Sequence, residues 1–342
     1  MRNGLHVSLV AASLLVGSCG DDDNPSMTPP PPGEDGAVPT PTPPTPQPPP
    51  PPGGDAGVIV PTPPPGMEAT VDIVMPEFEL GPYEENTLCY YTTVRVDGEL
   101  GIRGWESTMT AGSHHLIMFF TRSASRPDGT LEECGLTGIA GDLTGGVPIW
   151  AYAAQEPEAS IQYPPGVGFP FTTEQHLFVQ MHYLNATGET IRPNVRITGR
   201  SYPQGQEYIR AGVFATFNTE IEVPPGETGS AGGNCEVTGD ENFFMLSTHS
   251  HQFTTSARVF DGDNMLVDTD DWEHPAVQQW NAEPFYRFTS GRLRYECEYQ
   301  NPTRSTIRTG DSAETDEMCM AVGYFFPSRG MRFCFNDRVI SL

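Results

Sequence analysis

The stretch EQHLFVQMHYL (residues 174–184) combines apolar residues with the aromatic Phe178 and Tyr183 and reads as a β-strand. Similar runs recur along the chain, among them LCYYTTVRV (88–96), HHLIMFF (114–120) and CMAVGYFF (319–326). Gly, Pro, Asn and Asp separate the runs, and no long stretch shows sustained helical periodicity. The sequence therefore predicts an all-β fold of two tandem antiparallel β-sandwich, or jelly-roll, domains.

The first residues are interpreted as a lipoprotein signal. Residues 1–18 combine Arg2 with an apolar core that is too short for a comfortable transmembrane helix. The Val-Gly-Ser-Cys sequence that ends at Cys19 resembles a bacterial lipobox, in which Cys19 would be acylated. We therefore expect an extracytoplasmic protein held on a membrane only by its lipid anchor. Gly20 is not a retention-type Asp, which favours the outer membrane or cell surface; ordinary signal cleavage with an incidental Cys is the alternative.

The composition changes again after Cys19. Residues 19–66 are dominated by Pro, cannot bury a core, and are expected to form a disordered tether after the lipidated Cys. The folded part is predicted to begin at Met67. The turn-rich segment SYPQGQEY (201–208) suggests a division into domains 67–203 and 204–342.

Charge and motif content exclude several classes of function. The chain carries 44 Asp and Glu against 18 basic residues, a formal net charge of −26, which disfavours nucleic acid and anionic lipid headgroups as partners. All the basic residues are Arg, so a Lys Schiff base is impossible. The sequence contains no G-x-S-x-G motif, so a Ser-His-Asp hydrolase is not indicated.

The cysteine count indicates disulfides. Apart from Cys19, six of the 7 Cys remain: Cys89, Cys134, Cys235, Cys297, Cys319 and Cys334. An even set in an oxidising compartment predicts disulfide bonds. None forms a C-x-x-C pair, so neither a zinc ribbon nor a thioredoxin-type motif is indicated.

Histidines and one methionine form the candidate metal ligands. They are His114 and His115 in SHHLIMFF, His182 in LFVQMHY, His249 and His251 in STHSHQF, and Met318 in DEMC. Imidazole suits copper in either oxidation state, and a thioether favours Cu(I). Read as one set of three imidazoles and one of two imidazoles plus a thioether, they suggest copper redox chemistry. His6, His176 and His274 carry no such signal.

The local patterns leave alternatives open. On a strand, residues i and i+2 face the same side, so His249 and His251 can reach one ion. Neighbours on a regular strand face opposite sides, so His114 and His115 can bind one ion only if the strand is irregular there or near its end. Taken alone, His182 is equally explained as a hydrogen-bonded core histidine, and Met318 as core packing.

Six segments in order make the chain resemble the copper type II, ascorbate-dependent monooxygenases, which include peptidylglycine α-hydroxylating monooxygenase and dopamine β-monooxygenase. The segments are NTLCYYTTVRV, SHHLIMFF, LFVQMHY, AGVFATFNTEIEVPPGE, STHSHQF and DEMC. The resemblance implies two copper ions per chain and hydroxylation of an sp³ C–H of a small organic substrate. The reaction would use O₂ and ascorbate or a similar reductant.

The resemblance also implies roles for individual residues. His114, His115 and His182 would hold the electron-transfer copper, with Gln180 matching a Gln near that site. The catalytic copper, where O₂ and substrate meet, would be held by His249, His251 and Met318. The implied disulfides are Cys89–Cys134, Cys235–Cys334 and Cys297–Cys319, the last bracing the strand that presents Met318.

The match departs from the peptide-hydroxylating member at the substrate contacts. Ser247 stands where that member has a carboxylate-clamping Arg, and Met320 and Val322 stand where it has an Asn and a Tyr. A glycine-extended peptide is therefore not indicated, and a neutral or aromatic substrate is expected. A cationic amine is compatible with the acidic chain.

Two other functions are compatible with the same residues. One is a copper-binding lipoprotein that retains the ligands without turnover. The other is a zinc-binding adhesion module on a stalk.

Overall fold

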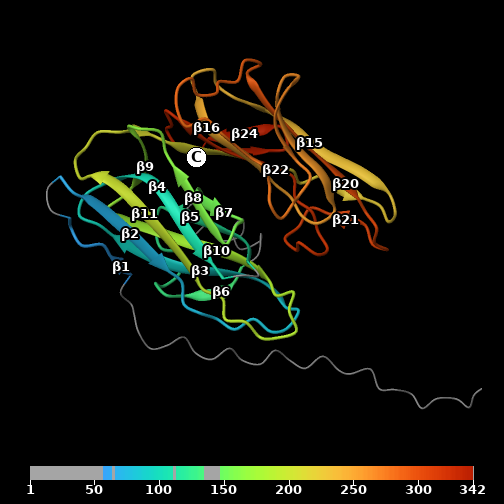
Figure 1. Cartoon of the computed structure of the whole chain (residues 1–342), viewed down its shortest axis with the longest axis horizontal. Coiled ribbons are helices and arrows are strands. Elements are labelled where there is room, and N and C mark those ends of the chain that lie inside the picture. Colours follow the sequence, from blue (N-terminus) through green and yellow to red (C-terminus); the bar gives the residue numbers. More distant parts are fainter. Residues whose placement is uncertain (1–56, 64–65, 111–112, 135–146, 342) are drawn as a thin grey trace, which may run out of the picture. The chain divides into compact units, whose positions relative to one another are not determined.

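The computed structural model describes residues 57–63, 66–110, 113–134 and 147–341 (Figure 1). The described residues belong to one compact unit and contain strands but no helix, which confirms the all-β prediction. None of them forms a helix with the length and apolar character needed to span a bilayer. The predicted signal, Cys19 and most of the predicted tether lie outside the described residues.

The N-terminal part of the fold consists of two sheets of six strands each. The first contains, in order, β1 (Val58–Ile59), β3 (Glu85–Arg95), β10 (Glu174–Leu184), β5 (Ser113–Thr121) and β7 (Ile149–Ala154), with β6 (Leu131–Glu133) beside β3. The second contains β12 (Ile209–Arg210), β9 (Val167–Phe171), β4 (Leu100–Met109), β11 (Val195–Pro203) and β2 (Glu68–Val74), with β8 (Glu158–Gln162) beside β4.

These two sheets pack face to face around a shared core. Trp105 on β4 of the second sheet is fully buried, and its ring centroid lies 6.4 Å from that of Phe120 on β5 and 6.2 Å from that of Tyr152 on β7. The alternation of buried and exposed residues along β2 reflects one face on the core and one on solvent. This is the predicted β-sandwich arrangement.

The folded part begins earlier than predicted. β1 pairs in parallel with β3 through Val58↔Val94 and Ile59↔Arg95, and Val60 is buried in the core. This strand lies inside the segment that the Pro-rich composition assigned to the tether. Two residues of backbone pairing and one buried side chain are too short a pattern for composition to reveal.

The C-terminal part contains two larger sheets and a two-stranded one. The first larger sheet has the order β19 (Val277–Gln279), β16 (Asn242–His249), β22 (Met320–Phe326), β13 (Gly212–Phe217), β23 (Arg332–Phe335), β24 (Arg338–Ser341). The second has the order β15 (Thr228–Glu236), β20 (Arg292–Gln300), β17 (Thr254–Asp261), β18 (Asn264–Thr269), and β14 (Glu222–Val223) pairs with β21 (Ile307–Arg308).

Strand β22 is buried on both faces and joins two cores. Met320, Val322 and Tyr324 belong to the hydrophobic cluster that fills the N-terminal part, whereas Ala321 and Phe325 belong to the cluster that fills the C-terminal part. Burial on both faces explains why apolar and polar residues do not alternate in the sequence of β22. The two parts therefore meet through a continuous apolar core, and the candidate site lies at this junction.

The predicted division between residues 203 and 204 stays a prediction. β11 ends at Pro203, but β12 still pairs with β9 of the N-terminal part, and the C-terminal sheet begins with β13 at Gly212.

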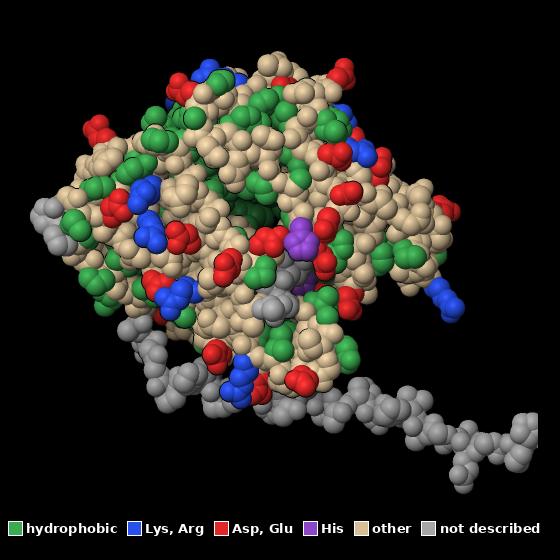
Figure 2. Space-filling view, viewed as in Figure 1, with side chains coloured by type: hydrophobic (Ala, Val, Ile, Leu, Met, Phe, Trp, Pro, Cys, Tyr) green, Lys and Arg blue, Asp and Glu red, His purple; other side chains and the backbone are tan. Residues whose placement is uncertain are grey.

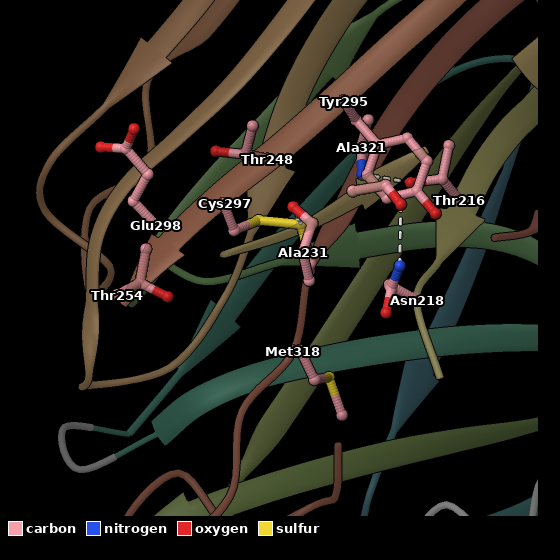
Figure 3. The surroundings of a disulfide bond; sticks show 12 residues. Thr216, Asn218, Ala231, Thr248, Thr254, Tyr295, Cys297, Glu298, Met318 and Ala321 are labelled. Carbon is pink, nitrogen blue, oxygen red and sulfur yellow. Dashed lines mark hydrogen bonds between the residues drawn. A yellow bond between two sulfur atoms is a disulfide. The ribbon is translucent and has the colours of Figure 1, made fainter. Parts of the chain in front are cut away.

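All three predicted disulfides are confirmed. Cys89 on β3 bonds Cys134 after β6, and Cys235 on β15 bonds Cys334 on β23. The third bond joins Cys297 on β20 to Cys319, the residue before β22, and so connects the two larger C-terminal sheets (Figure 3). Met318 adjoins this bond in sequence, and its side chain points away from the bonded sulfurs.

Candidate metal centre

His115 and His182 lie directly opposite each other on neighbouring strands. Their Cα atoms are paired across β5 and β10, and their ring centroids are 5.1 Å apart. Their exposed fractions are 6% and 1%. The structure therefore brings together two imidazoles of the predicted three-histidine set, and both are buried.

His114 occupies an irregular position in β5. The register passes from His182↔His115 to Tyr183↔Ser113, so His114 is an extra residue in the pairing. This is the irregularity that two adjacent histidines need if both are to bind one ion. The His114 side chain lies outside the described part of the structure, so its participation stays a prediction.

His249 and His251 come together without sharing a strand. β16 ends at His249, and His251 lies in the turn before β17, so the expectation that both stand on one strand is wrong. Their ring centroids are nevertheless 5.5 Å apart, and both side chains are buried.

The backbone N–H groups of Met318 and His251 share one carboxylate as their hydrogen-bond acceptor. Oε2 of Glu317 accepts hydrogen bonds from the backbone N–H groups of His251, at 3.0 Å, and of Met318, at 3.1 Å. Tyr299 donates its hydroxyl to the Met318 carbonyl at 3.2 Å. Met318 precedes β22 and is 5% exposed. These contacts hold the backbone of Met318 close to that of His251.

The two predicted ligand sets meet in one cluster of rings. The ring centroids of His115 and His249 are 5.0 Å apart, and those of His182 and His251 are 6.4 Å apart. The sequence had suggested separate centres assembled from distant segments, and the structure brings four of their imidazoles into contact.

This cluster does not present a ready-made site for one ion. Among the described carboxylate, thiolate and imidazole groups, the only three whose ligand atoms all lie within 4.8 Å of one another are the exposed Asp271, Glu273 and His274. No three of the four clustered imidazoles therefore converge on a single point. The arrangement is compatible with separate sets that also draw on His114 and Met318.

Three of the clustered imidazoles have one ring nitrogen bonded to an oxygen that can only accept. His182 Nε2 lies 2.8 Å from Glu85 Oε1, His249 Nδ1 lies 3.1 Å from Gln155 Oε1, and His251 Nδ1 lies 3.2 Å from the Asp316 carbonyl. The bonded nitrogen must carry the proton, which leaves the lone pair on the other nitrogen. Metal-binding histidines commonly have such a partner. The donor set therefore fits copper, and the sequence gave no signal for Glu85, Gln155 or Asp316.

Burial keeps two of the histidines neutral. Burial lowers the pKa of His249 to about 4 and that of His251 well below its usual value, and neighbouring histidines add to both effects. Neutral imidazole is the form that binds a metal. Burial also raises the pKa of Glu317 to about 7, although four hydrogen bonds oppose the change.

Glu85 joins the two parts of the fold. Its carboxylate bonds His182 and also accepts hydrogen bonds from the Ser312 hydroxyl at 2.8 Å and the Ala313 N–H at 2.9 Å. Burial raises the pKa of Glu85, but these hydrogen bonds outweigh it, so the pKa lies below its usual value. Ser312 and Ala313 precede Glu317 and Met318, so one loop contacts both ligand sets.

The remaining predicted positions lie close to the cluster. Gln180 is buried on β10, two residues from His182 and hence on the same face. Ser247 and Val322 are paired across β16 and β22, and Met320 is paired with His249. A cavity of about 230 Å³ adjoins His115, His249, Ser247 and Val322.

Comparison with known proteins identifies the C-terminal part. Residues 209–340 match the family described as copper type II ascorbate-dependent monooxygenase, C-terminal domain. The match supports the copper type II ascorbate-dependent monooxygenase family for this part of the chain. The match confirms the resemblance predicted from the sequence, and it covers three of the candidate monooxygenase ligands, His249, His251 and Met318. No curated protein sequence matches the chain significantly.

Solved structures give only distant likenesses. The major capsid protein P2 from bacteriophage PM2 is 8% identical, with 76% of this chain and 99% of that chain covered and a TM-score of 0.30. PNGase F, a glycosylasparaginase from Flavobacterium meningosepticum, is 8% identical, with coverages of 80% and 99% and a TM-score of 0.32. The PBSX exported protein XepA is 10% identical, with coverages of 74% and 86% and a TM-score of 0.17. Likenesses this weak carry no argument about function.

Proposed function

We propose that the chain is a copper-dependent monooxygenase that hydroxylates an sp³ C–H of a small organic substrate with O₂ and an ascorbate-type reductant. The observation that carries the proposal is the set of buried imidazoles whose second ring nitrogens are bonded to Glu85, Gln155 and Asp316. Their position in a chain whose residues 209–340 match the family supports it.

The proposed ligand sets follow the family pattern. His114, His115 and His182 would hold one copper in an N-terminal domain, and His249, His251 and Met318 would hold the second in a C-terminal domain. Bound copper would supply one-electron redox chemistry and the activation of O₂. A thioether in the second set favours Cu(I), the state that reacts with O₂.

The chain's own residues prepare the site for this chemistry. Glu85, Gln155 and the Asp316 carbonyl orient three imidazoles and fix which nitrogen carries the proton. Glu317 and the Cys297–Cys319 disulfide hold the backbone at Met318. The apolar core that surrounds β22 limits access of water. Orientation and water exclusion are the contributions that a protein makes to cofactor chemistry.

We further propose that the protein acts outside the cytoplasm, anchored through acylated Cys19. Its three disulfides support an oxidising compartment.

The experiment is oxygen consumption and product analysis with the copper-loaded full chain, ascorbate and a panel of aromatic and aliphatic substrates. We expect hydroxylated product that is lost in His249→Ala and Met318→Ala. His274→Ala is the matched control, because this histidine is exposed and bonds Asp271 rather than the cluster. Tight copper binding without product would instead favour the non-catalytic copper-binding protein, and zinc in place of copper would contradict both.

A further inference from the structure

The cavity beside the histidine cluster is built from both parts of the fold. Ile117, Trp150 and Tyr152 line it from the N-terminal strands, and Met245, Val322 and Tyr324 line it from β16 and β22. His115 and His249 also line it, so a molecule in the cavity lies against one imidazole of each predicted set. Figure 2 shows a hollow with hydrophobic side chains on its walls and acidic and histidine side chains beside it.

The lining offers no partner for an anion. No Arg stands among the described residues that line the cavity, and the chain has no Lys. A carboxylate or phosphate placed there would be desolvated without a compensating charge, which is strongly unfavourable. Ser247 and Val322 face each other across the strands, and the Ser247 hydroxyl already donates to the Ala276 carbonyl at 3.0 Å.

The one charged side chain of the lining is a poor partner for a cation. Among the described residues, Glu156 is the only acidic or basic residue that lines the cavity apart from the histidines. It is partly exposed, and it already interacts with the exposed His274. Water and His274 therefore screen its charge, and a buried ammonium would gain little from it.

The volume limits the size of the occupant. A cavity of about 150 Å³ holds benzene. The volume of about 230 Å³ found here leaves room for one aromatic ring and a few further atoms.

We propose that this cavity binds the substrate, and that the substrate is an uncharged, largely apolar molecule of the size of one substituted aromatic ring. The inference rests on the proposed function, because it calls the bound molecule a substrate, but the binding itself requires no turnover. Aromatic and aliphatic walls provide the affinity.

The test is isothermal titration of the copper-loaded full chain, without reductant, with 2-phenylethanol, phenylacetate and phenethylammonium. These ligands share a ring and a chain and differ in charge. We expect 2-phenylethanol to bind at least about tenfold more tightly than either ion. Equal binding of the three, or a preference for either ion, would overturn the proposal.

Two variants locate the binding in the cavity. Val322→Arg should weaken 2-phenylethanol and favour phenylacetate, whereas Val74→Arg, on the exposed side of β2, should change neither. Absence of any product despite the expected binding would contradict the proposed reaction and leave the cavity assignment standing.

Discussion

The two histidine sets differ in the charge of their hydrogen-bond partners. His182 bonds the Glu85 carboxylate, whereas His249 and His251 bond the neutral oxygens of Gln155 and Asp316. A carboxylate partner makes an imidazole a more basic ligand, which favours the more highly charged metal ion. Neutral partners and the Met318 thioether favour Cu(I). Under the proposed function, these surroundings would suit the first set to storing an electron and the second to reacting with O₂.

The strongest way to break this comparison is to remove the carboxylate that joins His251 to Met318. In Glu317→Ala, the backbone N–H groups of His251, Phe253 and Met318 lose their acceptor. We expect a loss of about 3–5 kcal/mol in the free energy of unfolding, as for a broken buried network. Denaturant titration measures it. Glu314→Ala, at an exposed position of the same loop, is the control, and an equal loss there would contradict the role of Glu317.

The second prediction concerns pH and the neutral His-His-Met set. The pKa of His249 is about 4 in the fold and should be near its usual value of 6.5 in the unfolded chain. The unfolded chain therefore binds the proton first, and the His249 contribution to stability is complete above pH 6.5 and lost as the pH falls to 4. The contribution is ~3 kcal/mol.

The measurement compares copper-free wild type with His249→Gln across this range. The stability advantage of the wild type over the variant should grow as the pH rises from 4 to 6.5. The pKa of Glu317, raised to about 7, has the opposite effect on stability, but it is present in both proteins and cancels in the difference. A difference that does not change with pH would contradict the neutral state of His249.

A charge-removing substitution sharpens the comparison at the other set. Glu85→Gln keeps an oxygen near His182 Nε2 but removes the negative charge. We expect about a 10–100-fold loss of Cu(II) affinity at the three-histidine set, with a smaller loss for Cu(I). Competition titrations in both oxidation states measure it. Glu84→Gln is the matched control, because Glu84 lies at the neighbouring position and bonds the Gly81 N–H instead. Equal losses of Cu(II) and Cu(I) affinity would mean that the charge of Glu85 does not distinguish the two oxidation states and that its role is structural.

The reverse substitution has the smallest expected effect. Gln155→Glu would give His249 a charged partner like that of His182, and it should shift the second set toward Cu(II) by less than about tenfold, because Gln155 is only partly buried. Electron paramagnetic resonance during a redox titration would follow the shift. No change in either direction would mean that the partner's charge does not distinguish the sets.

Sequence patterns predicted the strands, and the family resemblance implied the three disulfide pairs, because these depend on local residue types or on motifs. The irregularity at His114 was only a condition for both adjacent histidines to bind one ion, and the structure supplied it. Sequence patterns did not predict Glu85, Gln155 or Asp316, whose partners lie 97, 94 and 65 residues away. Spacing carries no signal for such contacts. Nor did they predict that β22 is buried on both faces, because a continuous apolar run leaves this ambiguous. The lipid anchor at Cys19 stays a prediction.

Copper K-edge X-ray absorption of the Cu(I)-loaded chain, combined with metal analysis, tests the central claim most directly. The proposed ligand sets predict two coppers per chain and a Cu–S contribution that disappears in Met318→Ala while the nitrogen contribution remains. Uptake of a single copper, or a spectrum without sulfur that Met318→Ala leaves unchanged, would contradict the proposal.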